Sequence, residues 1–147
     1  MKLSTKVRYG TRAMLDLAAH YGNGPTLLKD VARRQEISLK YLDRILSSLK
    51  AAGLVKTLRG SKGGFVVASL PSKITVSQIV EALEGPLELV GCIKGKDFCH
   101  RVNSCVMHDI WYELGKAMEV VLKTTTLEDL IIREKKKNRF TGKMYYI

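Results

Sequence analysis

Apolar residues in the first half of the chain recur at helical spacing in three short segments. The first helix is expected over residues 4–21, and the stretch 22–25 ends it, because glycine terminates helices and proline cannot continue them. A second short helix is expected over residues 26–35, and after a tight turn Ser38 caps a third helix over residues 39–52. The buried stripe of this third helix consists of Leu42, Ile45, Leu46 and Leu49.

A β-hairpin is predicted after the third helix. Residues 54–58 and 65–68 are rich in β-forming residues, and the turn-forming stretch 59–64 carries two cationic side chains between them. Residues 75–83 have the spacing of another short helix, which Gly85-Pro86 ends. Helix, short helix, tight turn, helix and hairpin is the order of a winged helix-turn-helix. In that fold the second helix of the motif enters the major groove, and the wing reaches the backbone or the minor groove.

The second half begins with a segment without clear periodicity and continues into a long helix. Residues 87–102 carry two of the cysteines, and a long apolar stripe begins after about Asn103. Thr126 and Asp129 resemble a capping box for a last short helix, and the basic tail from Arg133 is expected to be frayed or disordered. We therefore predict a mainly α-helical fold with a small β-hairpin wing, built as a winged helix-turn-helix plus a long dimerisation helix.

Four segments are expected along the chain. They are a winged helix-turn-helix DNA-binding domain (1–84), a cysteine-bearing sensor loop (85–103), a dimerisation helix region (104–132) and a basic tail (133–147). A small domain has little against which to bury the long apolar stripe, so a two-fold partner helix is expected, together with some packing on the first helix. The expected interface residues are Ile110, Trp111, Leu114, Met118 and Val121.

Positive charge is concentrated in the first half and in the tail. The formal net charge is +11, with +9 in residues 1–62, −3 in residues 63–132 and +5 in residues 133–147. Phosphate neutralisation requires a basic domain, although a basic surface can also serve solubility alone. Together with the predicted helix-turn-helix and its basic wing, the charge indicates double-stranded DNA with a palindromic operator as the partner.

The candidate DNA contacts lie in the second and third helices and at the tip of the wing. They are Lys29, Ser38, Lys40, Tyr41, Arg44, Arg59, Gly60, Ser61, Lys62, Gly63 and Gly64. Three alternatives remain open. Tyr41 could pack against the first helix, Arg44 could pair with Asp43 or another acid, and the glycines could serve hairpin geometry alone.

Several features limit the compartment and the class of protein. No apolar run approaches the roughly 20 residues that span a bilayer, and no apolar segment follows the basic N-terminus, so a cytoplasmic protein without membrane association is expected. Three cysteines do not suit a secreted disulfide framework, and clustered cysteines in a reducing cytosol serve metal or redox chemistry. The sequence shows no serine–histidine–acid set, no phosphate-cradling loop and no paired carboxylates, so no feature indicates an enzyme.

The cysteines form a cluster with one histidine. Cys92, Cys99, Cys105 and His108 have the spacing Cys-x6-Cys-x5-Cys-x2-His, which is not that of a zinc ribbon. Iron–sulfur clusters need soft thiolate ligands held by a loop, and imidazole can replace one thiolate. The spacing therefore predicts a cluster site, and inert buried cysteines or a thiol switch without metal are the alternatives.

Four stretches resemble the Rrf-two (Rrf2) family of bacterial transcription regulators, which includes IscR and NsrR. Residues 37–46 (ISLKYLDRIL) resemble the family's recognition helix, and residues 52–55 (AGLV) and 59–65 (RGSKGGF) resemble its strand entry and wing. Residues 1–10 resemble its N-terminus, and the resemblance extends to about residue 132. Asp43-Arg44 departs from the family, which often has an acid followed by glutamine, and this departure bears on operator preference.

The resemblance implies a dimeric regulator, a repressor in the first instance, that senses redox state, nitric oxide or iron–sulfur status through a cluster on the three cysteines. His108 matches the position at which IscR-like members use histidine, whereas NsrR-like members use an acid in the first helix, where this chain has Arg8 and Arg12. We expect a 2Fe–2S cluster, with 4Fe–4S and a non-protein fourth ligand as alternatives. A regulator of the same fold without a cluster, switched by thiols or a partner protein, is the second interpretation.

Overall fold

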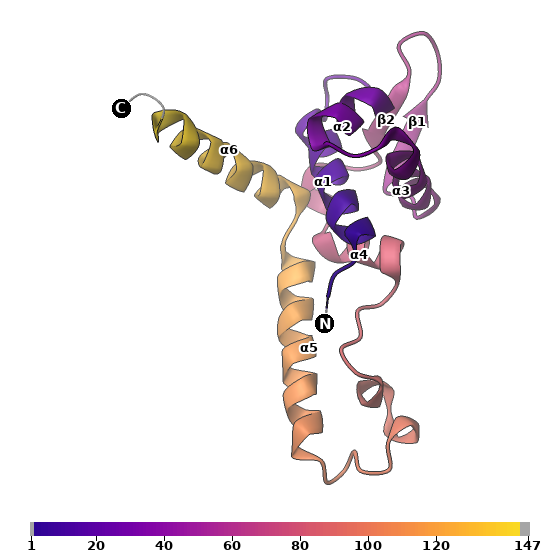
Figure 1. Cartoon of the computed structure of the whole chain (residues 1–147), viewed down its shortest axis with the longest axis vertical. Helices are drawn as coiled ribbons and strands as arrows, with labels where there is room; N and C mark the ends of the chain where they lie inside the picture. The colour runs from indigo at the N-terminus through magenta and orange to yellow at the C-terminus, as the bar shows by residue number, and fades with distance from the viewer. Residues whose placement is uncertain (1, 145–147) are drawn as a thin grey trace.

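The computed structural model describes residues 2–144, and its mainly helical architecture confirms the predicted fold class. The helices are α1 (Thr5–Ala19), α2 (Leu28–Gln35), α3 (Leu39–Ala51), α4 (Val76–Glu84), α5 (Val106–Thr124) and α6 (Leu127–Met144), and the hairpin strands are β1 (Val55–Leu58) and β2 (Gly64–Val67). Short 3-10 turns cover Pro71–Lys73, Gly91–Lys94 and Lys96–Phe98. Figure 1 shows α1–α4 and the hairpin gathered in one head, from which α5 extends as a long arm.

Helix α1 is the centre of the head. It packs against α2, α3, α4 and the start of α6, and Met14 in its middle is fully buried. Gly10 allows α1 to approach its neighbours closely, because a Cβ atom there would lie 2.2 Å from Leu83 Cδ1 and 3.3 Å from Ile45 Cγ2. The expected buried stripe of α3 is confirmed and consists of Leu42, Ile45, Leu46 and Leu49.

Two backbone hydrogen bonds join the hairpin to the segment that precedes α2. β1 and β2 are antiparallel, with Val55 opposite Val67 and Leu58 opposite Gly64. The Thr26 amide donates to the Phe65 carbonyl at 2.9 Å, and the Phe65 amide donates to the Thr26 carbonyl at 2.8 Å. The segment before α2 therefore fixes strand β2, close to the turn at the wing tip, relative to the helix-turn-helix.

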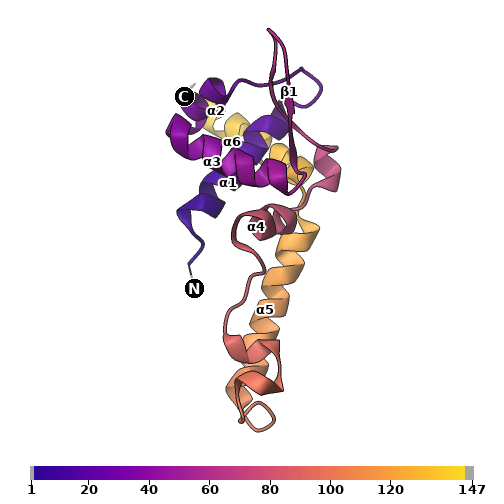
Figure 2. The same cartoon turned by 90° about the vertical axis from the view of Figure 1, so that its right-hand side faces the viewer.

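The segment from Glu84 to Thr126 forms an arm that extends away from the head in both views (Figures 1 and 2). Helix α5 packs against α4 and against the 3-10 turn Gly91–Lys94. None of the described side chains between Glu84 and Thr126 is buried, whereas Leu83 and Leu127 on either side belong to the core of the head. The arm therefore lacks a core of its own in the single chain.

Helix α6 corrects one expectation from the sequence. A short last helix and a frayed or disordered tail from Arg133 are predicted, but α6 continues to Met144. No proline interrupts residues 127–144, and lysine and arginine are good helix formers, so the local sequence supports a long helix. The predicted capping box is confirmed, since Thr126 Oγ1 accepts from the Asp129 amide at 3.2 Å and Asp129 Oδ2 accepts from the Thr126 amide at 2.9 Å.

Among the helices of residues 2–144, none is both long and apolar enough to cross a membrane.

Candidate functional site

The start of α3 carries the first group of candidate DNA contacts. Ser38 caps the helix, and its Oγ accepts a hydrogen bond from the Tyr41 amide at 3.3 Å. Glu36 in the turn before it has φ of 55°, a left-handed conformation that lets the chain reverse between α2 and α3. Lys40 and Arg44 are exposed on the side of α3 that faces away from the buried stripe. The helix therefore presents two cations and a capped N-terminus to solvent, which suits phosphate and base contacts.

Two of the alternatives for α3 can be examined directly. The Tyr41 ring packs edge-on against Tyr9 of α1, with 6.0 Å between ring centroids and 75° between ring planes. Tyr41 is half-buried beside the core, so its ring contributes to packing whatever its hydroxyl contacts. No ion pair within residues 2–144 includes Arg44. Its guanidinium is exposed and available to a ligand.

The tip of the wing carries the second group. Arg59, Ser61 and Lys62 are all exposed. Gly60 has φ of 118°, a conformation that side chains disfavour, so this glycine is required by the turn. A Cβ atom on Gly64 would lie 2.5 Å from the Thr26 carbonyl oxygen, and one on Gly63 would lie 2.4 Å from the Leu58 carbonyl oxygen. The turn and these close backbone contacts restrict the three positions to glycine, while Arg59, Ser61 and Lys62 present their polar side chains to solvent at the tip.

Lys29 lies apart from both groups in sequence. It is exposed in the first turn of α2, the helix that precedes the recognition helix. In a helix-turn-helix this first helix crosses the DNA backbone, so Lys29 is placed for a phosphate contact and not for a base contact.

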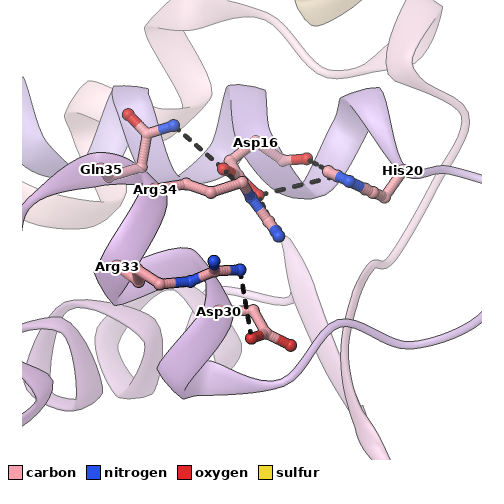
Figure 3. Close-up of polar contacts among 6 residues, drawn as sticks. All are labelled: Asp16, His20, Asp30, Arg33, Arg34 and Gln35. Carbon is pink, nitrogen blue, oxygen red and sulfur yellow. Dashed lines mark hydrogen bonds and ion pairs between the residues drawn. The ribbon is translucent and has the colours of Figure 1, made fainter.

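An ionic cluster around the buried carboxylate of Asp16 ties α1 to α2 beside the turn (Figure 3). The Asp16 side chain is 3% exposed and accepts hydrogen bonds from Arg34 Nε at 2.9 Å and Arg34 Nη2 at 2.7 Å. Gln35 Nε2 donates to the same carboxylate at 2.9 Å, and His20 Nδ1 donates to the Asp16 backbone carbonyl at 2.7 Å. Because Arg34 and Gln35 directly precede the turn at Glu36, the cluster fixes the end of α2 at which the turn to α3 begins.

The protonation state of Asp16 follows from these contacts. Burial raises the pKa of Asp16, but the hydrogen bonds from Arg34 and Gln35 and the charge of Arg34 outweigh it, so the pKa lies below its ordinary value. Asp16 is therefore a carboxylate at neutral pH. Arg12 reinforces the cluster, since its Nε donates to Gln35 Oε1 at 3.2 Å and its Nη2 donates to the Gln35 carbonyl.

The sequence alone did not identify this cluster. Asp16 and Arg34 are separated by 18 positions, and their pairing depends on how α2 crosses α1. One signal was present, because Asp16 lies among the apolar residues Ala13, Met14 and Leu17 on the face of α1 that the core covers. A charged residue on a buried helical face needs a partner, and a search for that partner would have pointed to the cations of the next helix.

The three cysteines lie in the loop that connects the head to α5. Cys92 is in the 3-10 turn Gly91–Lys94, Cys99 follows the turn Lys96–Phe98, and Cys105 is the N-cap of α5. All three thiols are free and half-buried. Within residues 2–144 no three histidine, cysteine, aspartate or glutamate side chains are gathered closely enough to form a metal site. The cysteines therefore share one loop, but their side chains are not assembled around one point.

His108 lies in the first turn of α5, near Cys105. Its amide donates to the Cys105 carbonyl at 3.1 Å, and its Nδ1 is 3.6 Å from Asp109 Oδ1. The His108 side chain is 19% exposed. Cys105 as the N-cap and His108 in the first turn thus both lie at the N-terminus of α5, whose free amide groups favour anionic ligands.

The predicted dimer residues on α5 fall on two faces. Ile110 and Val121 are 47% and 62% exposed, and together with half-buried Leu114 and exposed Ala117 they form a stripe with 4-3-4 spacing. Met118 instead lines the groove between α5 and α4. Trp111 is half-buried. The stripe has no partner among the described residues of this chain, whereas Met118 already faces the head.

Comparisons with known proteins give a consistent result. Residues 3–133 match the Rrf2 family, which is described as an iron-dependent transcriptional regulator. The chain is 42% identical to the HTH-type transcriptional regulator CymR of Bacillus subtilis over an alignment of 130 residues. This alignment covers 88% of this chain and 89% of CymR. The structure of B. subtilis CymR, described as the global cysteine regulator, superposes with a TM-score of 0.75 at 39% identity over 90% of this chain and 98% of CymR.

Two further solved structures are similar. The IscR protein of T. potens superposes with a TM-score of 0.77 and is 37% identical, covering 93% of this chain and 90% of that one. The oxidized form of Staphylococcus aureus CymR superposes with a TM-score of 0.72 and is 31% identical, covering 89% of this chain and 96% of that one. The likeness thus extends to proteins with two different names, CymR and IscR.

Proposed function

The chain belongs to the Rrf2 family of transcriptional regulators, and we propose that it is a cytoplasmic homodimer whose affinity for a palindromic DNA site is set by its cysteine loop. Its relatives are named as regulators, so it is a DNA-binding transcription regulator and not an enzyme. The proposal assigns DNA reading to residues 1–84, sensing to 85–103 and dimerisation to 104–132. It adopts repression as the mode of regulation.

DNA reading is assigned to α3 and the wing. Lys40 and Arg44 are exposed on the recognition helix behind the Ser38 cap, and Arg59 and Lys62 are exposed at the wing tip. The bonds between Thr26 and Phe65 hold the wing against the helix-turn-helix, so the two cationic groups are mounted on one rigid head. We assign base contacts to Arg44 and Ser38, and phosphate contacts to Lys29, Lys40 and the wing.

Dimerisation is assigned to the exposed stripe of α5. The arm from Glu84 to Thr126 has no buried side chain among those described, although it carries many apolar residues. A helix with such a stripe gains stability when a second helix covers it, and a two-fold axis would pair the stripe with itself. Two heads related by that axis would match the two halves of a palindromic site.

The donor set of the cysteine loop fits an iron–sulfur cluster in its chemistry. Three thiols and one imidazole are the ligand types that such clusters use, and each of the four side chains retains access to solvent. We assign Cys92, Cys99 and Cys105 as thiolate ligands and His108 as the fourth, with a 2Fe–2S core as the first choice. A bound cluster supplies a centre that responds to oxidants, nitric oxide and iron supply.

The role of the chain's own residues follows from their positions. Gathering the four ligands requires Cys92 and Cys99 to move relative to the first turn of α5, because the structure does not bring the side chains together. Cys105 and His108 belong to that first turn, so the conformation of the loop and the placement of α5 are coupled. Since α5 carries the dimer stripe, the loop would set the spacing of the two heads, and the loop from Val90 to Asn103 is the two-state element that allostery requires in this proposal.

A second candidate function is a thiol switch without a cluster. It is favoured by the free, half-buried state of the three thiols and by the names of two similar structures, a global cysteine regulator and an oxidized CymR. In that case a two-electron oxidant would convert two loop thiols to a disulfide, or one loop thiolate would exchange with a small-molecule disulfide and release its thiol, and either product would change the conformation of the loop. Both candidates use the same cysteines and the same coupling to α5.

The experiment that separates the two candidates is anaerobic purification followed by visible absorption, iron analysis and acid-labile sulfide analysis. Wild type is compared with Cys92→Ala, and Asp97→Ala in the same loop serves as the control. Iron, sulfide and a visible band in wild type and the control, lost in Cys92→Ala, would establish the cluster. Thiols without iron or sulfide after reconstitution would exclude the cluster and favour the thiol switch.

A further inference from the structure

The second half of α6 is a basic helix that has no part in the DNA-reading surface assigned to the head or in the dimer stripe assigned to the arm. Residues 133–144 carry six lysine and arginine residues and one glutamate. Every residue from Arg133 to Gly142 is exposed, and no ion pair within residues 2–144 involves Lys135, Lys136, Lys137 or Arg139. The match to the Rrf2 family model ends at residue 133.

The cations cover the part of the helix surface that the anchor leaves free. Leu127, Leu130 and Ile131 anchor the start of α6 on the head, and at 100° per residue Glu134 and Asn138 continue that anchoring side. Arg133, Lys136 and Arg139 point away from the anchor, whereas Lys135 and Lys137 lie at its two edges. Arg133–Lys137 and Lys135–Arg139 are spaced i,i+4, where like charges disfavour an isolated helix. A stripe of this kind gains stability when it meets a polyanion.

The basic helix is mounted on the head and not on the arm. Leu127 is fully buried, and its amide donates to the Ile74 carbonyl at 2.9 Å. The Val76 amide donates to the Thr125 carbonyl at 2.9 Å, and α6 also packs against α1. The helix projects beyond the head in Figure 1. Its orientation is therefore fixed relative to α3 and the wing, and it moves with them when they bind.

We propose that the cationic stripe of α6 binds the phosphate backbone of duplex DNA outside the site that α3 and the wing read. This inference rests on the proposed function, since it requires the head to bind DNA. Charge complementarity selects the partner, because DNA is a polyanion that continues past both ends of any operator. The projecting part of α6 is about 17 Å long at 1.5 Å per residue, which is about half of one DNA helical turn. The contact carries no base specificity and adds affinity that depends on salt.

The test uses the full-length protein and a duplex that it selects from a random-sequence library. That duplex is trimmed to its shortest bound core, and the same core is also extended by about 10 base pairs, one helical turn, at each end. Affinity for both duplexes is measured over a range of salt concentrations for wild type and for Lys136→Gln/Arg139→Gln. Glutamine keeps helix propensity while it removes the charge. The matched control is Lys116→Gln/Lys123→Gln, which removes the same charge from α5, where both lysines pair with Glu119.

We expect wild type to bind the extended duplex more tightly than the core, with a steeper salt dependence. The α6 variant should lose this advantage, its salt slope becoming shallower by about 1.8 per protomer on the extended duplex only, since each phosphate contact contributes about 0.9. The control should behave as wild type. The inference is overturned if the α6 variant binds both duplexes with the affinity of wild type, or if its affinity falls by the same factor on both. It is also overturned by a change in sedimentation without a change in DNA affinity, which would assign the stripe to a second copy of the chain.

The same experiment separates this inference from the function on which it rests. Arg59→Ala/Lys62→Ala in the wing is measured beside the α6 variant. If the wing variant weakens binding to both duplexes and the α6 variant has no effect, the flanking contact is wrong and the proposed function stands. If wild type selects no duplex at all, the proposed DNA-reading function itself fails.

Discussion

The carboxylate of Asp16 accepts two hydrogen bonds from the guanidinium of Arg34, at 2.9 and 2.7 Å, and so joins the last turns of α1 to the end of α2. This pair lies next to the turn that sets the direction of the recognition helix. Asp16 is buried and Arg34 is one-third exposed, so the pair combines a desolvated acceptor with a donor that remains partly hydrated. Its loss should affect both the stability of the head and its fit to DNA.

Asp16→Asn should lower the free energy of unfolding by about 2 kcal/mol at pH 7, less than the loss of a fully buried pair because Arg34 keeps contact with water. Because the pKa of Asp16 is lowered in the folded protein, its contribution is complete above the ordinary value of 3.8 and is lost as pH falls through the folded pKa. Urea unfolding of both proteins between neutral and acidic pH measures this. Asp30→Asn, which breaks only the exposed pair with Arg33, serves as the control. A difference between wild type and Asp16→Asn that stays constant below pH 3.8 would contradict the assignment.

Gly10→Ala should destabilise the head although alanine is the better helix former. The new Cβ atom would lie 2.2 Å from Leu83 Cδ1 inside the core, and overpacking of this kind costs about 1–3 kcal/mol. Gly115→Ala is the control, because a Cβ atom there would meet only Leu89 Cδ1 at an ordinary 3.8 Å. Chemical denaturation distinguishes the two, and equal stability of Gly10→Ala and wild type would show that the α1–α4 contact can relax without cost.

Arg59→Ala and Lys62→Ala should weaken DNA binding by similar amounts on every sequence. Each removes one phosphate contact, so the slope of log K against log salt should become shallower by about 0.9. Arg44→Ala should instead relax discrimination between bases at one position of each half-site, by about 1–3 kcal/mol. Competition binding with single-base variants of the selected duplex measures both effects. Wing variants that change base preference, or an Arg44→Ala variant that keeps it, would reverse the assignment of roles.

Ile110→Glu should convert the protein to a monomer at micromolar concentration. Ile110 lies in the exposed stripe with Leu114, Ala117 and Val121, and a buried carboxylate at a two-fold interface would face its own copy. Glu113→Gln on the same helix is exposed and should leave assembly unchanged. Sedimentation velocity provides the measurement. Wild type that sediments as a monomer would refute the dimer assignment independently of any variant.

The local sequence is sufficient to predict the helices and strands of the head. The stripe of α3, the Ser38 cap and the hairpin follow from spacing and turn residues, which act between near neighbours. The cluster at Asp16 could not be located in the same way, because it depends on the crossing of α1 and α2. The sequence pattern predicts too short an α6, because a run of positive charge favours a disordered tail whereas the helix propensity of lysine and arginine favours continuation of the helix to Met144.

The candidate sensor shows a similar division. The sequence pattern places Cys92 and Cys99 in a loop and Cys105 at the start of the long helix, and in the structure Cys92 and Cys99 lie in or beside the two 3-10 turns while Cys105 is the N-cap of α5. Spacing could not determine whether their side chains converge, because the loop contains the turns at Gly91–Lys94 and Lys96–Phe98 and has no buried side chain among those described to fix it. Likewise the long apolar pattern of α5 did not separate Ile110 on the exposed stripe from Met118 in the groove, which depends on how α5 packs against α4.

Control of DNA affinity by the cysteine loop can be measured in a single binding experiment. Affinity for the selected duplex is determined by fluorescence anisotropy for anaerobic wild type before and after oxidant treatment, beside Cys92→Ala under both conditions. Treatment should change the affinity of wild type at least about fivefold and leave Cys92→Ala unchanged. Equal affinity of wild type in both states, or an equal change in the variant, would contradict control through this loop.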